Sequence, residues 1–301
     1  MELDRRRFLQ VCGLAAGSLL APCHVAMAAP LAAAAPGAMG MLTDLTKCIG
    51  CGWCQKACRE WNDLTASSES PGRSDPCLSA DTWTLPELKQ VNLDGETHHV
   101  FVKRQCMHCV DPACVSACPV GALQKQDDGA VTYDCTRCIG CRYCMVACPF
   151  GIPKFEWEEP LPRIRKCTFC VDRQADGLAP ACATVCPTGA LTFGERDALI
   201  AEAQARIEAN PGAYVDHIYG KDELGGTSWL YISPVPFEKL DFPALKSEPV
   251  TELSESVATF GTAGVATSVT VLLGGLYYWF NGRKKEIEVQ GLDASEGEEE
   301  E

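Results

Sequence analysis

Sixteen of the chain's twenty cysteines fall into four blocks of four. Within a block, neighbouring cysteines are separated by two to four residues, apart from one gap of eleven residues in the last block. In order, the blocks are Cys48, Cys51, Cys54 and Cys58; Cys106, Cys109, Cys114 and Cys118; Cys138, Cys141, Cys144 and Cys148; and Cys167, Cys170, Cys182 and Cys186. Thiolates are soft ligands that suit iron–sulfur clusters and zinc, and in an oxidising compartment thiols also form disulfides. The spacing of these cysteines is therefore the feature that separates metal chemistry from disulfide chemistry.

The first and third blocks share the spacing C-x2-C-x2-C-x3-C, and the third continues into proline. This is the [4Fe–4S] pattern of bacterial ferredoxins, in which the fourth cysteine ligates the other cluster of a pair. Structural zinc would need paired C-x2-C hairpins, so three thiolates within seven residues would leave one ligand unused. Cysteines three positions apart rarely meet disulfide geometry. The spacing therefore favours four [4Fe–4S] clusters over both alternatives.

Four cysteines lie outside the pattern: Cys12, Cys23, Cys77 and Cys135. The first two lie near the N-terminus, and Cys77 lies in a polar stretch rich in serine, proline and glycine. Cys135 stands three residues before Cys138 and could compete with it. The three-residue gap between Cys144 and Cys148 favours Cys138 as the first ligand of its block. We expect all four to be spare cysteines.

The composition is that of a folded protein and not of a nucleic-acid-binding one. The chain has 301 residues, of which 47% are hydrophobic and 22% are charged, so it can bury a core. Its formal net charge of −14 is opposite in sign to what nucleic acid attracts. We therefore expect no nucleic-acid partner.

Short hairpins and helices are expected to position the blocks. The segments Cys118–Leu123 and Cys186–Leu191 are two copies of one turn into a strand, and Asp128-Gly129 is a tight-turn pair between short strands. Apolar residues at helical spacing predict a helix over Glu195–Ala209, and Trp229–Ile232 is expected to form a strand. Such hairpins bury little by themselves, so the clusters would supply the core that they lack.

Residues 1–28 have the features of an export signal. Three arginines precede Phe8-Leu9, an uncharged stretch follows, and Ala26-Met27-Ala28 fits a small-x-small cleavage pattern. Two arginines, one spacer and Phe-Leu resemble the twin-arginine signal, which exports proteins already folded. Clusters could then be inserted in the reducing cytoplasm before export. An ordinary secretory signal with three arginines is the alternative interpretation.

The C-terminal region predicts a membrane anchor. No charged residue occurs between Glu255 and Arg283, and an uncharged helix of this length is sufficient to cross a bilayer. Tyr277, Tyr278 and Trp279 would lie at the membrane interface, followed at once by basic residues that stay in the cytoplasm. We therefore expect a transmembrane helix over residues 257–282, an acidic cytoplasmic tail over 283–301, and a body at the periplasmic face of the inner membrane. A buried soluble helix is the alternative.

The whole chain resembles the four-cluster ferredoxin-type beta subunits of membrane-bound oxidoreductases. The segments Met107–Pro112, Arg142–Pro149 and Val235–Leu240 are closer to the iron–sulfur subunit of periplasmic nickel–iron hydrogenase of the hydrogenase-2 type. The segments Glu60–Asp63 and Cys170–Arg173 are similar to the beta subunit of respiratory formate dehydrogenase. The export signal favours the hydrogenase subunit, because the formate dehydrogenase subunit typically travels on its partner's signal.

The resemblance implies an α+β fold of two pseudo-symmetric bacterial-ferredoxin-like modules, with short hairpins and helices around four [4Fe–4S] clusters and one C-terminal transmembrane helix. The four-cluster domain would cover residues 43–195, and a C-terminal extension would cover 196–256. In this family block one pairs with block four, and block two with block three. Cys58 is followed by Arg59 where the other blocks have proline, which leaves its turn less certain than its thiolate.

The resemblance also implies which cysteines share a cluster. Set one would be Cys48, Cys51, Cys54 and Cys186, and set two Cys167, Cys170, Cys182 and Cys58. Set three would be Cys106, Cys109, Cys114 and Cys148, and set four Cys138, Cys141, Cys144 and Cys118.

The function that the resemblance implies is electron transfer, with no catalytic residue in the chain itself. Electrons would pass along the four clusters between catalytic hydrogenase subunits, or formate dehydrogenase subunits as the alternative, and a quinone-reactive membrane subunit. His108 and Trp53, inside cluster loops, would tune a cluster or simply shield it from water, and shielding is the simpler expectation. A structural or assembly protein that binds metal is the competing class.

Overall fold

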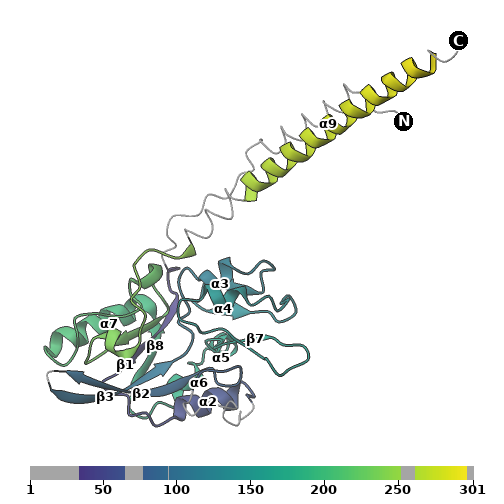
Figure 1. Cartoon of the computed structure of the whole chain (residues 1–301). Coiled ribbons are helices and arrows are strands. Elements are labelled where there is room, and N and C mark those ends of the chain that lie inside the picture. Colours follow the sequence, from purple (N-terminus) through teal and green to yellow (C-terminus); the bar gives the residue numbers. More distant parts are fainter. Residues whose placement is uncertain (1–33, 65–76, 94, 252–261, 297–301) are drawn as a thin grey trace. The chain divides into compact units, whose positions relative to one another are not determined.

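A three-stranded sheet connects the first and last cysteine blocks. Its order is β8–β1–β9, in which β1 (Met39–Asp44) pairs antiparallel with β8 (Leu191–Glu195) and parallel with β9 (Trp229–Ile232). Figure 1 shows the three strands side by side in the body of this computed structural model, which describes residues 34–64, 77–93, 95–251 and 262–296. Because β1 ends just before block one and β8 begins just after block four, their pairing brings these two distant blocks together.

The predicted helix and strand of the C-terminal extension complete this sheet. Helix α7 spans Arg196–Ala209, so it begins one residue later than predicted and ends at the predicted residue. Strand β9 has the predicted bounds. All four residues of β9 are buried, as expected for a strand covered on both faces. Leu199 and Ala203, one helical turn apart, pack with Leu42 of β1 and Leu230 of β9. The extension is thus part of the same core as the cysteine blocks.

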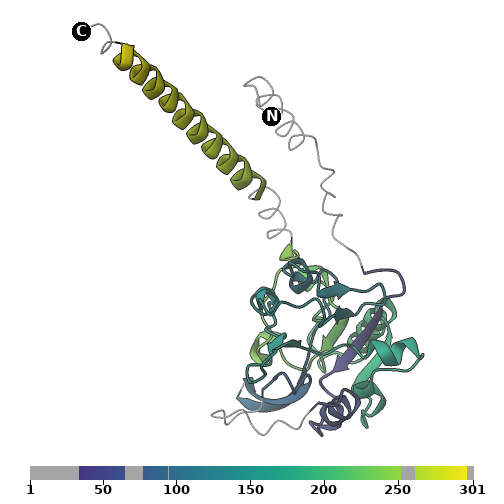
Figure 2. The same cartoon turned by 90° about the vertical axis from the view of Figure 1, so that its right-hand side faces the viewer.

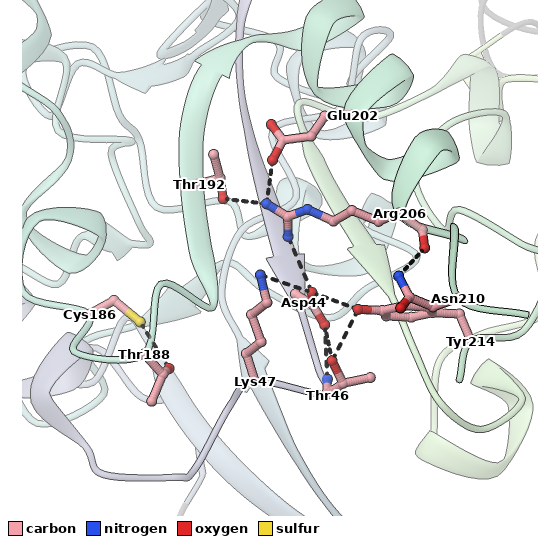
Figure 3. Close-up of polar contacts among 10 residues, drawn as sticks. All are labelled: Asp44, Thr46, Lys47, Cys186, Thr188, Thr192, Glu202, Arg206, Asn210 and Tyr214. Atoms are coloured by element: carbon pink, nitrogen blue, oxygen red, sulfur yellow. Dashed lines mark hydrogen bonds and ion pairs between the residues drawn. The ribbon is translucent and has the colours of Figure 1, made fainter. Parts of the chain in front are cut away.

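A buried carboxylate fastens α7 to the end of β1. Asp44 accepts hydrogen bonds from the Thr46 hydroxyl at 2.6 Å and the Tyr214 hydroxyl at 3.1 Å. It also forms an ion pair with Arg206 of α7 at 3.2 Å, and Lys47 lies 3.7 Å away (Figure 3). A fully buried carboxylate is stable only when charged and hydrogen-bonding groups surround it in this way. The network therefore fixes the chain immediately before Cys48.

Short helices carry the third cysteine of every block. They are α2 (Trp53–Trp61), α3 (Ala113–Ser116), α4 (Tyr143–Ala147) and α6 (Ala181–Thr184). Helix α2 packs against α6, and α3 packs against α4. Blocks one and four therefore share one module, and blocks two and three share the other, so the cysteine-rich part is built from two similar halves of mixed helix and strand.

The remaining elements are small hairpins and turns. The predicted turn at Asp128-Gly129 joins β4 (Leu123–Lys125) to β5 (Val131–Tyr133). The other elements of the body are β6 (Lys154–Phe155), β7 (Ile164–Arg165), α5 (Val171–Ala175), η1 (Glu223–Gly225) and η2 (Phe237–Leu240).

A long hairpin that the sequence analysis did not predict covers the loop of block one. It consists of β2 (Leu85–Leu93) and β3 (Glu96–Arg104), which pair antiparallel. Figure 2 shows the body that contains this hairpin after a turn of 90° from the view of Figure 1. Val100 and Val102 of β3 are buried in the core. Residues alternate between the two faces of a strand, so Phe101 and Lys103 point the other way, and the Phe101 ring lies against Gly50.

The predicted signal and part of the predicted membrane span lie outside the residues that the structure describes. Residues 1–28, the predicted signal, lie outside the described residues, as do 257–261 of the predicted membrane span. The second unit of the chain, from Val250 onward, contains α9 (Thr262–Glu296), which continues as a helix into the segment predicted to be a tail. Among the described residues, no helix combines the length and the apolar character needed to cross a membrane.

Two glycines of block one allow a direct test of the hairpin's role. Gly50 and Gly52 both have positive φ, 67° and 76°, but a Cβ would overlap the Phe101 ring only at Gly50. We expect Gly52→Ala to lower the free energy of unfolding by about 1–2 kcal/mol through backbone strain. Gly50→Ala should cost a further ~1–3 kcal/mol through the overlap. Thermal unfolding and iron content of the purified variants measure both effects, and equal losses would contradict the proposed contact.

Candidate iron–sulfur sites

The four thiols of set one line one cavity. Cys48, Cys51, Cys54 and Cys186 surround it together with Trp53 and Lys103. The positive φ angles of Gly50 and Gly52 turn the loop of block one tightly, and β1–β8 pairing brings Cys186 opposite. A loop of this kind can point several thiols at one centre, which ordinary helix or strand geometry does not allow.

The four thiols of set four line a second cavity of the same kind. Cys118, Cys138, Cys141 and Cys144 surround it with Tyr133 and Ile164. Gly140 and Arg142 have φ angles of 69° and 64°, so this loop repeats the geometry of block one. Cys135, the neighbouring cysteine, is exposed and does not line the cavity.

The thiols of sets two and three lie deeper. Burial raises the pKa of Cys58 to about 12, and the nearby thiols of Cys182 and Cys170 contribute to the increase. In set three, burial raises the pKa of Cys109 well above its usual value, with Cys106, Cys148 and Cys114 as charged neighbours. The thiols of sets one and four thus share a cavity each, and the thiols within sets two and three are electrostatic neighbours. Which cysteines ligate which cluster stays a prediction.

The four sets form a row through the body. Cys54 of set one and Cys182 of set two belong to one hydrophobic cluster. Cys58 and Cys167 of set two pack with Cys106 of set three, and Cys114 of set three packs with Cys144 of set four. Each set therefore has a thiol near a thiol of the next set, in the order one, two, three, four: Cys54 near Cys182, Cys167 near Cys106, and Cys114 near Cys144.

Backbone N–H groups point at the sulfur atoms. The N–H groups of Ala122, Gly140 and Phe169 donate to the Sγ atoms of Cys118, Cys138 and Cys167 at 3.2, 3.4 and 3.4 Å. At Cys118, burial raises the thiol pKa, but the N–H groups of the turn after it outweigh burial and lower the pKa. These donors favour the thiolate, the form that binds metal.

Cys186 has the same environment in the second copy of the turn. Burial alone would raise its pKa, and the N–H groups of Leu191 and Ala190 together with Thr188 lower it. The Thr188 hydroxyl lies 3.8 Å from the Cys186 sulfur (Figure 3). The predicted repeat Cys-Pro-x-Gly-Ala-Leu is therefore a repeated thiolate-stabilising turn.

Burial of the other thiols fits a bound cationic iron core. Burial raises the pKa of Cys54, Cys144 and Cys170 to about 11, so that as free thiols they stay protonated near neutral pH. Iron displaces these protons, as metal does from any coordinating thiol. In the described part of the chain, no three His, Cys, Asp or Glu side chains group closely enough to hold a single metal ion. The thiols of sets one and four surround a cavity each instead, and four thiols per cavity match the ligands of a [4Fe–4S] cluster.

His108 and Phe169 occupy equivalent positions in blocks two and four, and they meet at the contact between the modules. Their rings stack with centroids 4.8 Å apart, and both residues have positive φ. His108 is fully buried, and its Nδ1 accepts a hydrogen bond from the Val131 N–H at 2.9 Å. Burial lowers the pKa of His108 well below its usual value, with Lys166, Lys125 and Lys103 adding to the effect. His108 is therefore neutral and shielded from water.

Two residues near the thiols were missed by the sequence analysis. Lys103 is buried at the cavity of set one and its charge also acts on Cys58 and Cys167 of set two, although nothing in its local sequence distinguishes it from a surface lysine. Tyr133 lies against Cys138, and its hydroxyl accepts a hydrogen bond from the Ile164 N–H at 3.2 Å. Trp53, considered above as a shield, is half exposed at the edge of the set-one cavity.

Comparison with known proteins identifies the class. Residues 97–196, which include blocks two to four, match the 4Fe-4S dicluster domain. A protein of Nitratidesulfovibrio vulgaris strain Hildenborough is 44% identical over 90% of this chain and 74% of its own length. The hydrogenase-2 operon protein HybA of Escherichia coli O157:H7 is 37% identical over 90% of this chain and 93% of its own length. The iron–sulfur subunit of the nitrate-inducible formate dehydrogenase of Escherichia coli K12 is 34% identical over 82% and 86%.

The fold and the match together define a ferredoxin-type iron–sulfur protein. More narrowly, the chain belongs to the family of iron–sulfur proteins that contains HybA and the formate dehydrogenase iron–sulfur subunits. The predicted family is therefore confirmed, and with it the presence of [4Fe–4S] clusters. The number of clusters and the residues that ligate each one stay predictions.

Cys135 and Cys138 offer a matched test of the ligand assignment. We expect Cys138→Ser to lower the iron content of the reconstituted protein and to change the paramagnetic resonance spectrum of one cluster, because set four loses a thiolate. Cys135→Ser should leave both unchanged, because its side chain is exposed outside the cavity. Iron analysis and spectroscopy of the reduced variants measure this. The opposite pattern would assign Cys135 as the ligand.

Proposed function

We propose that this chain relays single electrons through four [4Fe–4S] clusters, one at each thiol set. The observation that supports the proposal is the row of four thiol sets, each with a thiol near a thiol of the next set. When bound, the clusters supply one-electron redox centres. An electron relay needs neighbouring cluster sites that lie close together. Four independent structural metal sites would have no such requirement.

The protein's own residues hold the clusters, orient them and exclude water. All four thiols of set two are buried and two of set three are, whereas sets one and four are more exposed. Ile49 and Trp53 are more than half exposed beside set one, and so are Ile139 and Tyr143 beside set four. Exposed apolar side chains at both ends of the row support partner proteins there, one to deliver electrons and one to accept them.

The partners that we propose are catalytic nickel–iron hydrogenase subunits and a quinone-reactive membrane subunit. The similarity to HybA, which covers 93% of that protein, supports the hydrogenase partner. The formate dehydrogenase iron–sulfur subunits are relatives at 34–37% identity, and they support formate dehydrogenase as the second candidate. The export signal on this chain favours the first.

The location that we propose is the periplasmic face of the inner membrane. The proposal rests on the sequence of residues 1–28 and on the uncharged segment 257–282. Protease protection in spheroplasts, with a tag after residue 301, would test it. A protected tag together with a digested body is the expected pattern.

The function is tested by isolating the complex in mild detergent from membranes of the native host. We expect the complex to reduce an artificial dye with hydrogen and not with formate, because the catalytic partner determines the electron donor. Reduction with formate alone would establish the second candidate. A purified chain that binds zinc and gives no signal from reduced clusters would establish the structural class instead.

Cys54→Ser tests whether electrons pass through the clusters of this chain. The variant should contain less iron and should lose hydrogen-dependent quinone reduction, while hydrogen-dependent dye reduction at the catalytic partner continues. Cys77→Ser is the matched control, because Cys77 does not belong to any of the four sets. Full iron content with normal quinone reduction in Cys54→Ser would rule out the assignment.

A further inference from the structure

Lys103 is a buried ammonium group at the contact between sets one and two. Its side chain extends from β3 into the interior, and the residue is 2% exposed. The Nζ donates a hydrogen bond to Oε1 of Gln105 at 2.9 Å and lies 4.3 Å from the centre of the Trp229 ring. An amide oxygen and an aromatic face stabilise a cation, but both are neutral.

No carboxylate pairs with Lys103 among the residues that the structure describes. A buried charge without a partner of opposite sign is costly, and proteins normally avoid it by pairing the charge or by losing it. The groups whose negative charge acts most on the ammonium group are the thiols of Cys182, Cys54 and Cys167, followed by the Tyr231 hydroxyl. The sulfur atoms are therefore its source of negative charge.

The sulfur neighbours come from two different sets. Lys103 lines the cavity of set one with Cys48 and Cys54. Its charge also acts on Cys58 and Cys167 of set two. A single cation thus faces both of the sites in the module that blocks one and four build.

We propose that Lys103 is the shared counter-ion of the first two cluster sites and raises the reduction potentials of both. This inference deepens the proposed cluster relay and rests on it. Reduction adds one negative charge to a thiolate-bound cluster, and a fixed positive charge in a medium of low dielectric constant favours that form. Clusters at these two sites would therefore accept an electron more readily with Lys103 present than without it.

Lys125 shows what a buried lysine with different neighbours does. Its Nζ donates to the Gly129 carbonyl oxygen at 2.7 Å, and its nearest thiols are Cys109 and Cys106 of set three. Burial lowers the pKa of Lys125 to about 8, and these thiols only partly offset the effect. The residue belongs to the other module, so its replacement is the matched control for Lys103.

The experiment is a redox titration of the purified, cluster-loaded full-length chain, followed by paramagnetic resonance. Lys103→Met keeps the length of the side chain and removes its charge. We expect the potentials of two clusters to shift downward and those of the other two to stay unchanged. Lys125→Met should leave the two clusters affected by Lys103→Met at their original potentials. Full iron content without a shift in Lys103→Met, or an equal shift of all four clusters, would overturn the proposal.

Two further variants decide the outcome if Lys103→Met does not assemble its clusters. Lys103→Arg keeps the charge, and Lys103→Gln keeps a hydrogen-bond donor without charge. Clusters that assemble in the arginine variant and fail in the glutamine variant would support a required counter-ion. Failure of both would show that packing is the cause and would overturn the proposal. The titration uses no hydrogen, formate or quinone, so its result is independent of which partners the relay serves.

Discussion

The cost of burying the thiolates that hold the predicted iron–sulfur clusters is the constraint on which the rest of the structure depends. Water solvates a thiolate well and a protein interior does not, so burial raises the pKa of thiols such as Cys58 and Cys114 to about 12. In the turns after Cys118 and Cys186, backbone N–H groups point at the sulfur atoms and lower the pKa of these two thiols. Backbone N–H groups of loops and tight turns thus stabilise the thiolate form of these cysteines, whereas the third cysteine of each block lies on a short helix.

The two modules bring their cysteine blocks together in different ways. Blocks two and three are neighbours in sequence, so sets three and four close through contacts between α3 and α4 and the small hairpin β4–β5. Blocks one and four are far apart and are joined by the pairing of β1 with β8. That pairing is in turn supported by β9 and α7. The segment after the cysteine blocks is therefore a structural requirement of sets one and two.

The sequence was sufficient where the determining pattern is local. The ligand blocks follow from spacing, α7 from apolar residues at helical intervals, and the turns after Cys118 and Cys186 from their repetition. The hairpin β2–β3 was not predicted, because polar residues interrupt its apolar ones, and its buried side chains Leu85, Val91, Val100 and Val102 are spread over two strands. Lys103 was not predicted either, because its burial results from Trp229 and the thiols of distant blocks, which no local pattern contains. The pairing of blocks one and four came from family resemblance and not from spacing.

The contact between His108 and Phe169 shows how the halves of the body are joined without exposing the row of sites. The two residues hold the same position in their blocks and have the same left-handed backbone, and their rings stack at the contact between the modules. Phe169 also packs against Trp229 and Phe193, and His108 keeps no exposed surface. The contact is therefore dry and aromatic between sets two and three. A medium of this kind does not reorganise around a moving charge as water does. His108 is two residues from Cys106 and Phe169 is two residues from Cys167, and these two thiols of sets three and two pack together. In the proposed relay, the ring contact therefore borders the step between modules.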